Sequence, residues 1–318
     1  MARMSDATRR SAGPAALGFA CVFLAARAGG AESSSPDERI DYGPGREIAK
    51  LACKEINESS GLAAGHANEN VFWTHNDSGA GPKLYAFGLK GEHLAVLTVT
   101  GARSRDWEDM ASFSLGRRHF LLVADVGDNA SARKDCCLYV LDEPKLRPSA
   151  KAQQVNVKPI QTIQFSYEDG PHNCESVAID PGRRKIYLVS KNVGMSCKLY
   201  ALDWPTRPGR AELVAKPVAS LSIPVTTAMD ISPDGERMVV LTYGDAWEYA
   251  RVAKEGWDAA CKRKPRRIRM PRRVQGESIC YGIDGKTLYL TSECRGKNSA
   301  EPSPLLEVPV VKAPDARR

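Results

Sequence analysis

The chain has 318 residues, of which 26% are charged and 7% are aromatic, and its formal net charge is +7 at pH 7. This length can bury a large hydrophobic core as one domain. The positive charge is modest, and no aromatic residues interleave the basic run at 262–273, so nucleic acid is excluded as a partner.

Residues 1–28 have the features of a secretory signal peptide. Arg9 and Arg10 precede a short apolar run, and an A-x-A cleavage site ends at Ala28. A hydrophobic anchor is the alternative, although the run is too short to span a bilayer, and no other segment could cross a membrane. The sequence therefore predicts a secreted or periplasmic protein. Its predicted parts are a signal peptide at 1–28, a linker at 29–46, one domain at 47–312 and a tail at 313–318.

A unit in which an acidic residue is followed 13 to 17 positions later by a second polar residue recurs five times. The pairs are Glu58 with His75, Glu108 with Asp125, Glu175 with Lys191, Asp230 with Tyr243 and Glu277 with Glu293. Successive acids lie 47 to 67 residues apart, which is room for three or four short strands and their turns. Self-similarity at a period of about 50 residues indicates a propeller or a solenoid.

Strand-like runs of β-branched and aromatic residues, separated by Pro and Gly turns, follow each acid, and no stretch has a helical period. We therefore predict an all-β fold, a β-propeller of five four-stranded blades. Residues 47–56 are expected to pair with the strand around 306–310 and close the ring, because the fifth blade lacks a strand and closure removes open sheet edges. Six blades are the alternative, if the interval between Glu108 and Glu175 hides a degenerate blade. The outer strands are expected to start at Leu94, Thr162, Leu213 and Arg266.

The innermost strands of a propeller line its central channel, so equivalent residues of successive blades converge on one mouth. Seven acids from the repeats would repel one another there unless a cation or basic side chains compensated them. Their hard oxygen atoms favour calcium over zinc. The alternative is that the acids accept hydrogen bonds from backbone N–H groups of the neighbouring blade and only fix its position. The predicted metal ligands are Glu58, Glu108, Asp125, Glu175, Asp230, Glu277 and Glu293.

Residues that differ between the repeats are the better candidates for binding a ligand, because function normally breaks symmetry. The second repeat is the richest in polar residues, and its Gly127 lets the backbone approach a ligand. Arg133 can clamp a phosphate or carboxylate, or else form a salt bridge with a neighbouring acid. The predicted ligand-binding residues are His75, Asn76, Asp77, Asp106, Asp128, Asn129, Arg133, Lys191 and Tyr243.

Eight cysteines follow the signal peptide, and an even number in an exported chain suggests disulfides. The preferred pairs are Cys174 with Cys197 and Cys280 with Cys294, because they occupy corresponding places in two repeats. Free buried thiols are the alternative.

Eight basic residues crowd into the segment from Lys262 to Arg273. Contact with an anionic polymer or membrane surface is one interpretation. The favoured interpretation is structural, since charged residues on an outermost strand protect it from edge pairing.

Two motifs of the second repeat carry a resemblance to a known family. The string D-W-E-D-M-A from Asp106, followed by V-A-D-V-G-D-N and Arg133, resembles a family of exported bacterial propeller proteins with D-W-E-D-[IM]-A and G-D-N-x-x-x-R motifs. More distantly, the design is similar to the gluconolactonase, paraoxonase and propeller-phytase groups. That resemblance implies calcium in or near the channel.

The sequence contains no G-x-S-x-G, no H-E-x-x-H and no glycine-rich phosphate loop. We therefore expect a monomeric exported propeller that binds a small molecule, a cell-envelope component or a partner protein at an acidic channel mouth. The alternative is a calcium-assisted hydrolase of a phosphoester or lactone. Glu108 or Asp125 would then be the base, and Lys191 or Arg133 would hold the anionic substrate.

Overall fold

The computed structural model describes residues 40–194, 196–294 and 301–311, so the predicted signal peptide, most of the linker and the C-terminal tail lie outside the described residues. Regular structure within these ranges is almost all strand, as predicted, and the one helix is the four-residue α1 (Trp257–Ala260). No helix in the described part of the chain is long and apolar enough to cross a membrane. The observed fold class is all-β.

Five groups of strands follow one another along the chain. The first contains β3 (Ser59–Ala64), β4 (Val71–Asn76), β5 (Lys83–Gly88), β6 (His93–Val99) and β10 (Gln153–Val157). The second contains β7 (Trp107–Leu115), β8 (Arg118–Asp125), β9 (Cys136–Asp142) and β11 (Gln161–Tyr167), and the third contains β12 (Cys174–Asp180), β13 (Lys185–Ser190), β14 (Cys197–Asp203) and β15 (Gly209–Leu221). The fourth contains β16 (Thr226–Ile231), β17 (Arg237–Thr242), β18 (Ala246–Ala250) and β19 (Arg266–Ile268), and the fifth contains β20 (Ser278–Tyr281), β21 (Leu288–Thr291), β22 (Pro304–Val308) and β2 (Arg46–Lys50).

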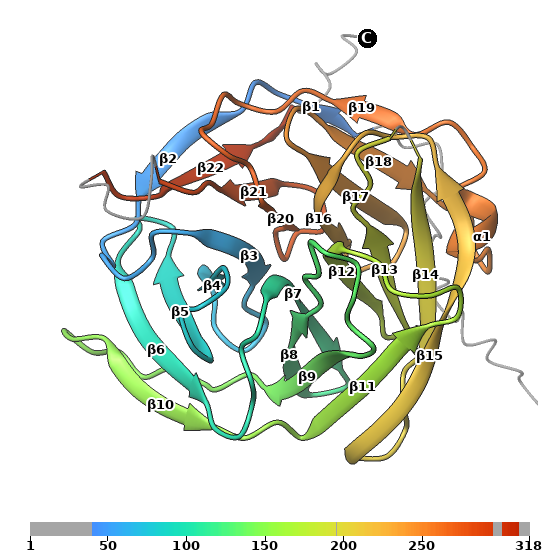
Figure 1. Cartoon of the computed structure of the whole chain (residues 1–318). Coiled ribbons are helices and arrows are strands. Elements are labelled where there is room, and N and C mark those ends of the chain that lie inside the picture. The colour runs from blue at the N-terminus through green and yellow to red at the C-terminus, as the bar shows by residue number, and fades with distance from the viewer. Residues whose placement is uncertain (1–39, 195, 295–300, 312–318) are drawn as a thin grey trace, which may run out of the picture. The chain divides into compact units, whose positions relative to one another are not determined.

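The first strands of the groups surround a common axis. Strands β3, β7, β12, β16 and β20 contact one another in this order, and β20 contacts β3 again (Figure 1). Within each group the later strands lie farther from the axis, mostly in antiparallel order. This arrangement is propeller-like. It brings residues that are 50 or more positions apart in sequence to one central place.

Strand β2, from the N-terminal side of the domain, pairs antiparallel with β22, so that Glu47 lies opposite Leu306 and Lys50 opposite Pro304. The sequence predicts this pairing, but the strand is shorter than predicted and ends at Lys50. A short additional antiparallel pair is formed by β1 (Asp41–Tyr42), which precedes β2 in the chain, and β23 (Val310–Val311), which follows β22. Strand β2 thereby covers the edge that β22 would otherwise expose.

The long interval between the second and third acids contains two outer strands that the repeat pattern did not separate. Strand β10 adds to β6 in parallel. Strand β11 pairs antiparallel with β9 and parallel with the 13-residue β15, which joins the second and third groups into an eight-stranded sheet. The expected outer strands at Leu94, Thr162 and Leu213 all lie within observed strands, β6, β11 and β15.

Apolar side chains from neighbouring groups pack between the sheets. Trp73 and Trp107 are fully buried in one such cluster, between the first and second groups. Leu122 and Ile186 lie in the next, between the second and third groups. Burying a side chain of this size is worth about 1.5–3 kcal/mol. These clusters therefore hold the first strands rigidly around the axis.

The disulfide prediction is wrong, because all eight cysteines in the described ranges are free thiols. Cys174 begins β12 and Cys197 begins β14, and β13 runs between these strands. Two strand spacings separate them by about 9–10 Å, beyond the reach of a disulfide. Cys280 lies opposite Tyr289 in the ladder of β20 and β21, and Tyr289 is five positions before Cys294. Cys280 and Cys294 are therefore not cross-strand neighbours.

The basic segment supplies β19, the outermost strand of its group, which pairs only with β18. Arg267 Nε lies 2.6 Å from Asp245 Oδ2, and Arg266 forms a longer ion pair with Asp41 at 3.6 Å. These charges lie on a sheet edge, where they disfavour pairing with another chain.

Candidate functional site

The first strands of the second and third groups begin with a register shift against the strand beside them. In β7 the shift lies between Trp107 and Asp109, so Glu108 occupies a bulge. In β12 the corresponding interval, between Cys174 and Val177, contains Glu175. A bulge re-aims a side chain and is common beside functional sites. Both acids are buried, with 5% of each residue exposed.

The corresponding shifts in β3 and β16 contain Ser60 and Thr227. The predicted equivalence of Glu58 and Asp230 with Glu108 is therefore wrong. Ser60 Oγ donates a hydrogen bond to the Glu108 carbonyl oxygen at 2.9 Å, so this position also links neighbouring groups. One signal in the sequence could have found the register, because an apolar residue follows two positions after each bulge position. These residues are Leu62, Met110, Val177, Met229 and, in the fifth group, Ile279.

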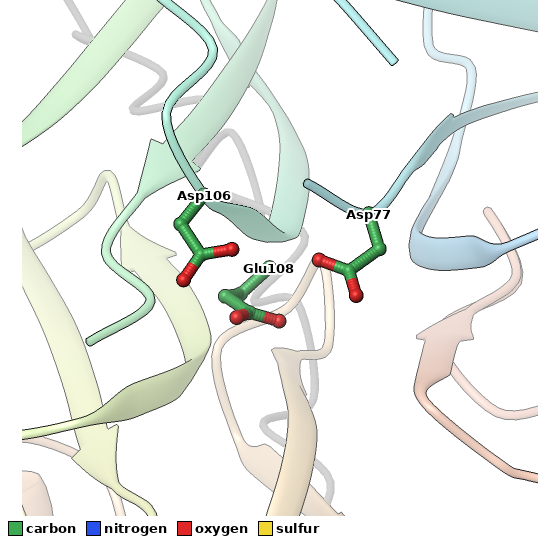
Figure 2. A group of neighbouring side chains, drawn as sticks. All are labelled: Asp77, Asp106 and Glu108. Carbon is green, nitrogen blue, oxygen red and sulfur yellow. The ribbon is translucent and has the colours of Figure 1, made fainter. Parts of the chain in front are cut away.

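Three carboxylates converge at the start of β7. Asp77 follows β4, Asp106 precedes β7, and Glu108 lies between them (Figure 2). One oxygen from each lies within 4.8 Å of the others. Two oxygens bound to one Ca²⁺ at 2.3–2.6 Å are up to about 5 Å apart. The spacing and the hard donor atoms therefore fit a calcium ion, with Asp77, Asp106 and Glu108 as the residues that would hold it.

The electrostatics of these carboxylates also favour a cation. Burial, followed by the negative charges of Glu175 and Asp77, raises the pKa of Glu108 well above its ordinary value. Burial and the charge of Asp77 raise the pKa of Asp106, although Arg133 opposes this. Among the described residues, no Lys or Arg forms an ion pair with any of the three carboxylates. Within the described ranges, arginine charges act on Asp106 from a distance, but no basic side chain forms an ion pair with the cluster.

Gly127 is necessary for this convergence. A Cβ atom at Gly127 would lie 2.3 Å from both Asp106 Oδ2 and Glu108 Oε1, far inside contact distance. The Gly127 N–H donates to the Asp106 carbonyl oxygen at 3.2 Å, which holds the two segments together. Any side chain at this position would displace the two carboxylates.

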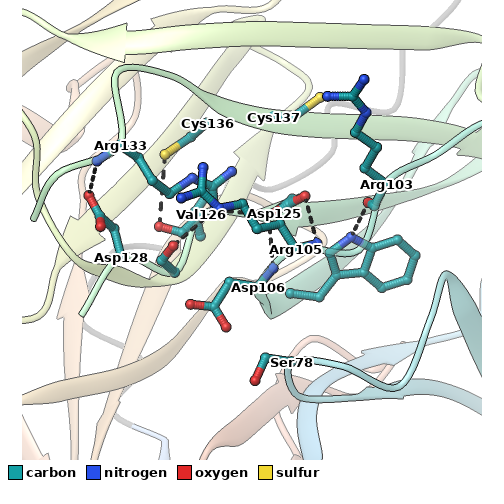
Figure 3. A network of polar contacts seen from close by, with 12 residues as sticks. Ser78, Arg103, Arg105, Asp106, Asp125, Val126, Asp128, Arg133, Cys136 and Cys137 are labelled. Atoms are coloured by element: carbon teal, nitrogen blue, oxygen red, sulfur yellow. Dashed lines mark hydrogen bonds and ion pairs between the residues drawn. The ribbon is translucent and has the colours of Figure 1, made fainter. Parts of the chain in front are cut away.

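Asp125 and Arg133 form an ion pair beside the cluster, with 2.9 Å between Arg133 Nη1 and Asp125 Oδ1, and both side chains are buried (Figure 3). Asp125 also accepts backbone hydrogen bonds from Asp106 at 3.1 Å and from Arg105 at 3.2 Å. Arg133 donates a further bond to the Gly127 carbonyl oxygen. This is the salt-bridge alternative for Arg133, and the pair positions the loop that carries Asp106.

Lys191 compensates the next acid around the axis. Its Nζ lies 2.5 Å from both carboxylate oxygens of Glu175 and 2.8 Å from the hydroxyl of Tyr243. Burial raises the pKa of Glu175 to about 7, while the charge of Lys191 opposes the shift. Burial opposes the charge on Lys191, but Glu175 raises the pKa of Lys191 above its usual range. Tyr243 is 47% exposed, so this trio reaches the surface of the mouth.

Glu277 and Glu293 complete the acidic mouth. Burial raises the pKa of Glu293 to about 8, and Glu277 adds to the shift because it accepts a hydrogen bond from the protonated Glu293 and because its negative charge opposes ionisation of Glu293. Gln275 Nε2 donates a hydrogen bond to Glu277 Oε1 at 2.6 Å. The charge of Glu58 also raises the pKa of Glu293, which places Glu58 near this pair.

A second layer of acids has a structural role. Asp109 accepts three backbone hydrogen bonds, from Met110 and Val177 at 2.8 Å and from Met229 at 3.1 Å. Asp230 accepts two, from Ile231 and Tyr281, both at 2.8 Å. These donors belong to neighbouring groups of strands as well as to the acid's own strand.

Asp230 therefore does not lie at the mouth. It accepts a backbone hydrogen bond from a neighbouring group, as the alternative interpretation of the repeated acids predicts. Burial raises its pKa to about 7, although its two backbone donors oppose the shift. Burial also raises the pKa of Asp109 well above its ordinary value.

Two predicted ligand-binding residues are internal. His75 is fully buried, edge-on to Trp107 with 5.7 Å between ring centroids, and its Nδ1 lies 3.0 Å from the Asn76 carbonyl oxygen. Asn76 accepts hydrogen bonds from the N–H groups of Asn57 and Glu58 at 3.2 Å. Both hold the segment that leads into β3.

Asp128 and Asn129 fix a loop at the rim of the mouth. Asp128 Oδ2 accepts a hydrogen bond from the Arg133 N–H at 2.7 Å. Asn173 joins the two segments, since its Oδ1 accepts from the Asp128 N–H at 2.8 Å and its Nδ2 donates to Asn129 Oδ1 at 3.1 Å. The exposed Asn129 remains accessible to a ligand.

Comparison with known proteins does not assign this chain to a family. No family model matches the sequence, and no curated protein matches it. Among solved structures, a chain in the crystal structure of the nidogen/laminin complex is similar, with a TM-score of 0.42 and 13% identity, over 74% of this chain and 73% of that chain. The fold assignment therefore rests on the strand pairing described above.

Proposed function

We propose that the five groups of strands are the blades of one propeller, and that this protein binds a divalent cation, calcium first, at Asp77, Asp106 and Glu108. The observation that carries the proposal is that one oxygen from each of these three carboxylates lies within 4.8 Å of the others. Among the described residues, no Lys or Arg forms an ion pair with any of the three. The more distant resemblance to the gluconolactonase, paraoxonase and propeller-phytase groups supports calcium as the cation, and the resemblance of the D-W-E-D-M-A and G-D-N motifs to exported propellers supports the fold. It also supports our proposal that the chain acts outside the cytoplasm.

A calcium ion takes six to eight oxygen ligands, so three carboxylates leave positions for water or for an oxygen of a ligand. Tyr243, Lys191 and Asn129 lie around the mouth and would contact that ligand. We therefore infer a binding protein for a small molecule, a cell-envelope component or a partner protein with oxygen-rich groups.

A second candidate is calcium-assisted hydrolysis of a phosphoester or lactone. One observation favours it: burial and Glu277 raise the pKa of Glu293 to about 8, which suits this residue to the role of a general acid at neutral pH.

Calorimetric titration of the mature chain with CaCl₂, after treatment with a chelator, tests the site. We expect saturable binding to the wild type and none to the Asp106→Asn/Glu108→Gln double variant. The exposed Glu69→Gln variant controls for loss of charge. Equal binding by the double variant would reject the site.

A glycine substitution tests the geometry without removing an acid. Gly127→Ala should abolish calcium binding, because its Cβ displaces Asp106 and Glu108. Gly182→Ala is the matched control, since its Cβ would meet only Asp180 Oδ1 at an ordinary 3.5 Å. Hydrolysis of phosphoester or lactone substrates that depends on calcium and is lost in Glu293→Gln would favour the enzyme. Binding without turnover would favour the binding protein.

A further inference from the structure

A cavity of about 370 Å³ lies on the far side of the Asp125–Arg133 ion pair from the acidic cluster. Its floor exists because β11 pairs with β15 and so extends the sheet of β9. Two rows of residues cross these three strands on one face. The first row is Tyr139, Thr162 and Arg210, and the second is Cys137, Gln164 and Glu212.

The loop before β7 closes one side of this cavity with Arg103 and Arg105 (Figure 3). Its backbone is held in place, since the Arg103 N–H donates to the Tyr139 hydroxyl at 3.0 Å and the Trp107 indole N–H donates to the Arg103 carbonyl oxygen at 2.9 Å. The Arg105 N–H donates to Asp125. The loop is therefore fixed while its two arginine side chains remain exposed.

The charges around the cavity are unevenly distributed. Arg103, Arg105 and Arg210 form no ion pair within the described ranges, whereas Arg133 is neutralised by Asp125. The remaining acids belong to the second row: Glu212 is part of it, and Asp135 accepts a hydrogen bond from Gln164. The first row and the loop thus form a cationic end with the free hydroxyl of Thr162, and the second row forms a polar, acidic end.

We propose that this cavity binds a small phosphate monoester. Arginine guanidinium groups match phosphate oxygens bidentately, and three of them converge on the cationic end without a partner. The hydroxyls of Thr162 and Tyr139 supply further contacts. The volume is in the range of small-molecule sites and exceeds what a phosphate ion needs. The hydroxyl-bearing part of the ligand lies against Gln164 and Glu212, which accept hydrogen bonds from it.

This site is distinct from the cation site, because within the described ranges Arg103, Arg105 and Arg210 form no ion pair with its three carboxylates, although the charge of Arg105 acts on Asp106. Calorimetry in the presence of a chelator therefore tests it alone. The probes are inorganic phosphate and glycerol 2-phosphate, with glycerol as the uncharged control. We expect both phosphates to bind, the monoester more tightly, and glycerol not to bind.

Arg210→Gln and Arg103→Gln, each on an exposed position, should weaken binding of both phosphates by about tenfold. Arg117→Gln is the matched control. It removes the same charge from an exposed turn at the other end of β7, about 25–30 Å away along the strand, and should bind as the wild type does. No heat with either phosphate, or wild-type affinity in both arginine variants, would overturn the proposal. Binding that required added calcium would also overturn it.

Discussion

Glu108 and Asp109 are neighbours in β7, yet their carboxylates meet opposite surroundings. Asp109 is fully buried and accepts three backbone hydrogen bonds. Glu108 occupies the bulge, faces Asp77 and Asp106, and accepts no hydrogen bond from a backbone N–H group in the described part of the chain. A carboxylate that accepts backbone hydrogen bonds stabilises the fold, whereas the charge of one surrounded by other carboxylates is disfavoured unless a proton or a cation neutralises it. Burial alone does not separate the two roles, since both residues are buried.

The largest effect is expected from Asp109→Ala. The substitution leaves the N–H groups of Met110, Val177 and Met229 without an acceptor, and each buried unsatisfied donor costs about 1–3 kcal/mol. Urea unfolding should show a loss of about 3 kcal/mol or more, with or without calcium. Asp109→Asn retains one acceptor oxygen and should lose less. Wild-type stability of the alanine variant would mean that Asp109 does not hold the groups together.

Lys191→Met should be the next most damaging change. It leaves the buried Glu175 without its partner at 2.5 Å, and breaking a buried pair costs about 3 kcal/mol. The loss should be greatest above pH 7 and should shrink in acid, because a protonated Glu175 needs no partner. A loss that does not change with pH would indicate that Lys191 acts through packing instead. Met preserves the length of the side chain, which controls for packing.

Glu108→Gln should act in the opposite direction to Asp109→Ala. In cation-free protein it removes a carboxyl group whose ionised form is disfavoured by burial and by neighbouring carboxylates, and it should raise stability at a pH high enough to ionise Glu108. It should also abolish stabilisation by calcium, which amounts to about 2.7 kcal/mol when the free cation is at 100 times its Kd. Thermal unfolding with and without CaCl₂ measures both effects. A destabilised variant that still responds to calcium would reverse the roles assigned to Glu108 and Asp109.

Glu293 should contribute to the pH dependence of the cation-free protein, together with Glu175 and Asp230, whose pKa values are raised to about 7. The pKa of Glu293 is 4.5 in ordinary surroundings and about 8 in the folded protein, so between these values the folded state holds a proton that the unfolded state releases. Stability therefore falls as the pH rises through this window, and it is greatest on the acid side. Glu293→Gln should reduce the slope of stability against pH, and the remaining slope belongs to Glu175 and Asp230. Denaturant unfolding at several pH values across this window measures the slope, and an unchanged slope would show that Glu293 does not contribute.

The smallest effect is expected at the strand that completes the fifth group. Arg46 and Glu307 form an ion pair at 2.8 Å between β2 and β22, but the arginine side chain is 67% exposed. Such a pair contributes about 0–1 kcal/mol. The free energy of unfolding of Arg46→Ala should therefore lie within about 1 kcal/mol of the wild-type value. A larger loss would show that the charge pair, and not the backbone ladder, closes the group.

Much of the fold is readable from local patterns. Runs such as K-I-Y-L-V-S at Lys185 carry β-branched and aromatic residues between turn residues, and they form β13 and its counterparts. The pairing of β2 with β22 also follows from counting strands per repeat, because an incomplete sheet needs a partner for its edge. These features depend on residue type and spacing, which the chain carries in one dimension.

The site depends on register and long-range contact, which the chain does not carry locally. In β16 the bulge position is occupied by Thr227, and Asp230, three positions later, accepts a hydrogen bond from the backbone of Tyr281. The repeated acids are therefore of two kinds, those at a bulge position and those that accept backbone hydrogen bonds. Residue type and spacing do not separate the two kinds, because the register follows from strand pairing.

Charge compensation is likewise a property of the assembled sheets. Arg133 pairs with Asp125, and Arg103 and Arg210 line one cavity because β15 pairs with β11, with Gln161 opposite Gly209. Composition and spacing along the chain thus predict strands, turns and the abundance of acids. The partner of each acid is decided by distances that arise only when the five groups pack around one axis. Among the described residues, some acids accept backbone hydrogen bonds, some pair with an arginine, and others have neither partner.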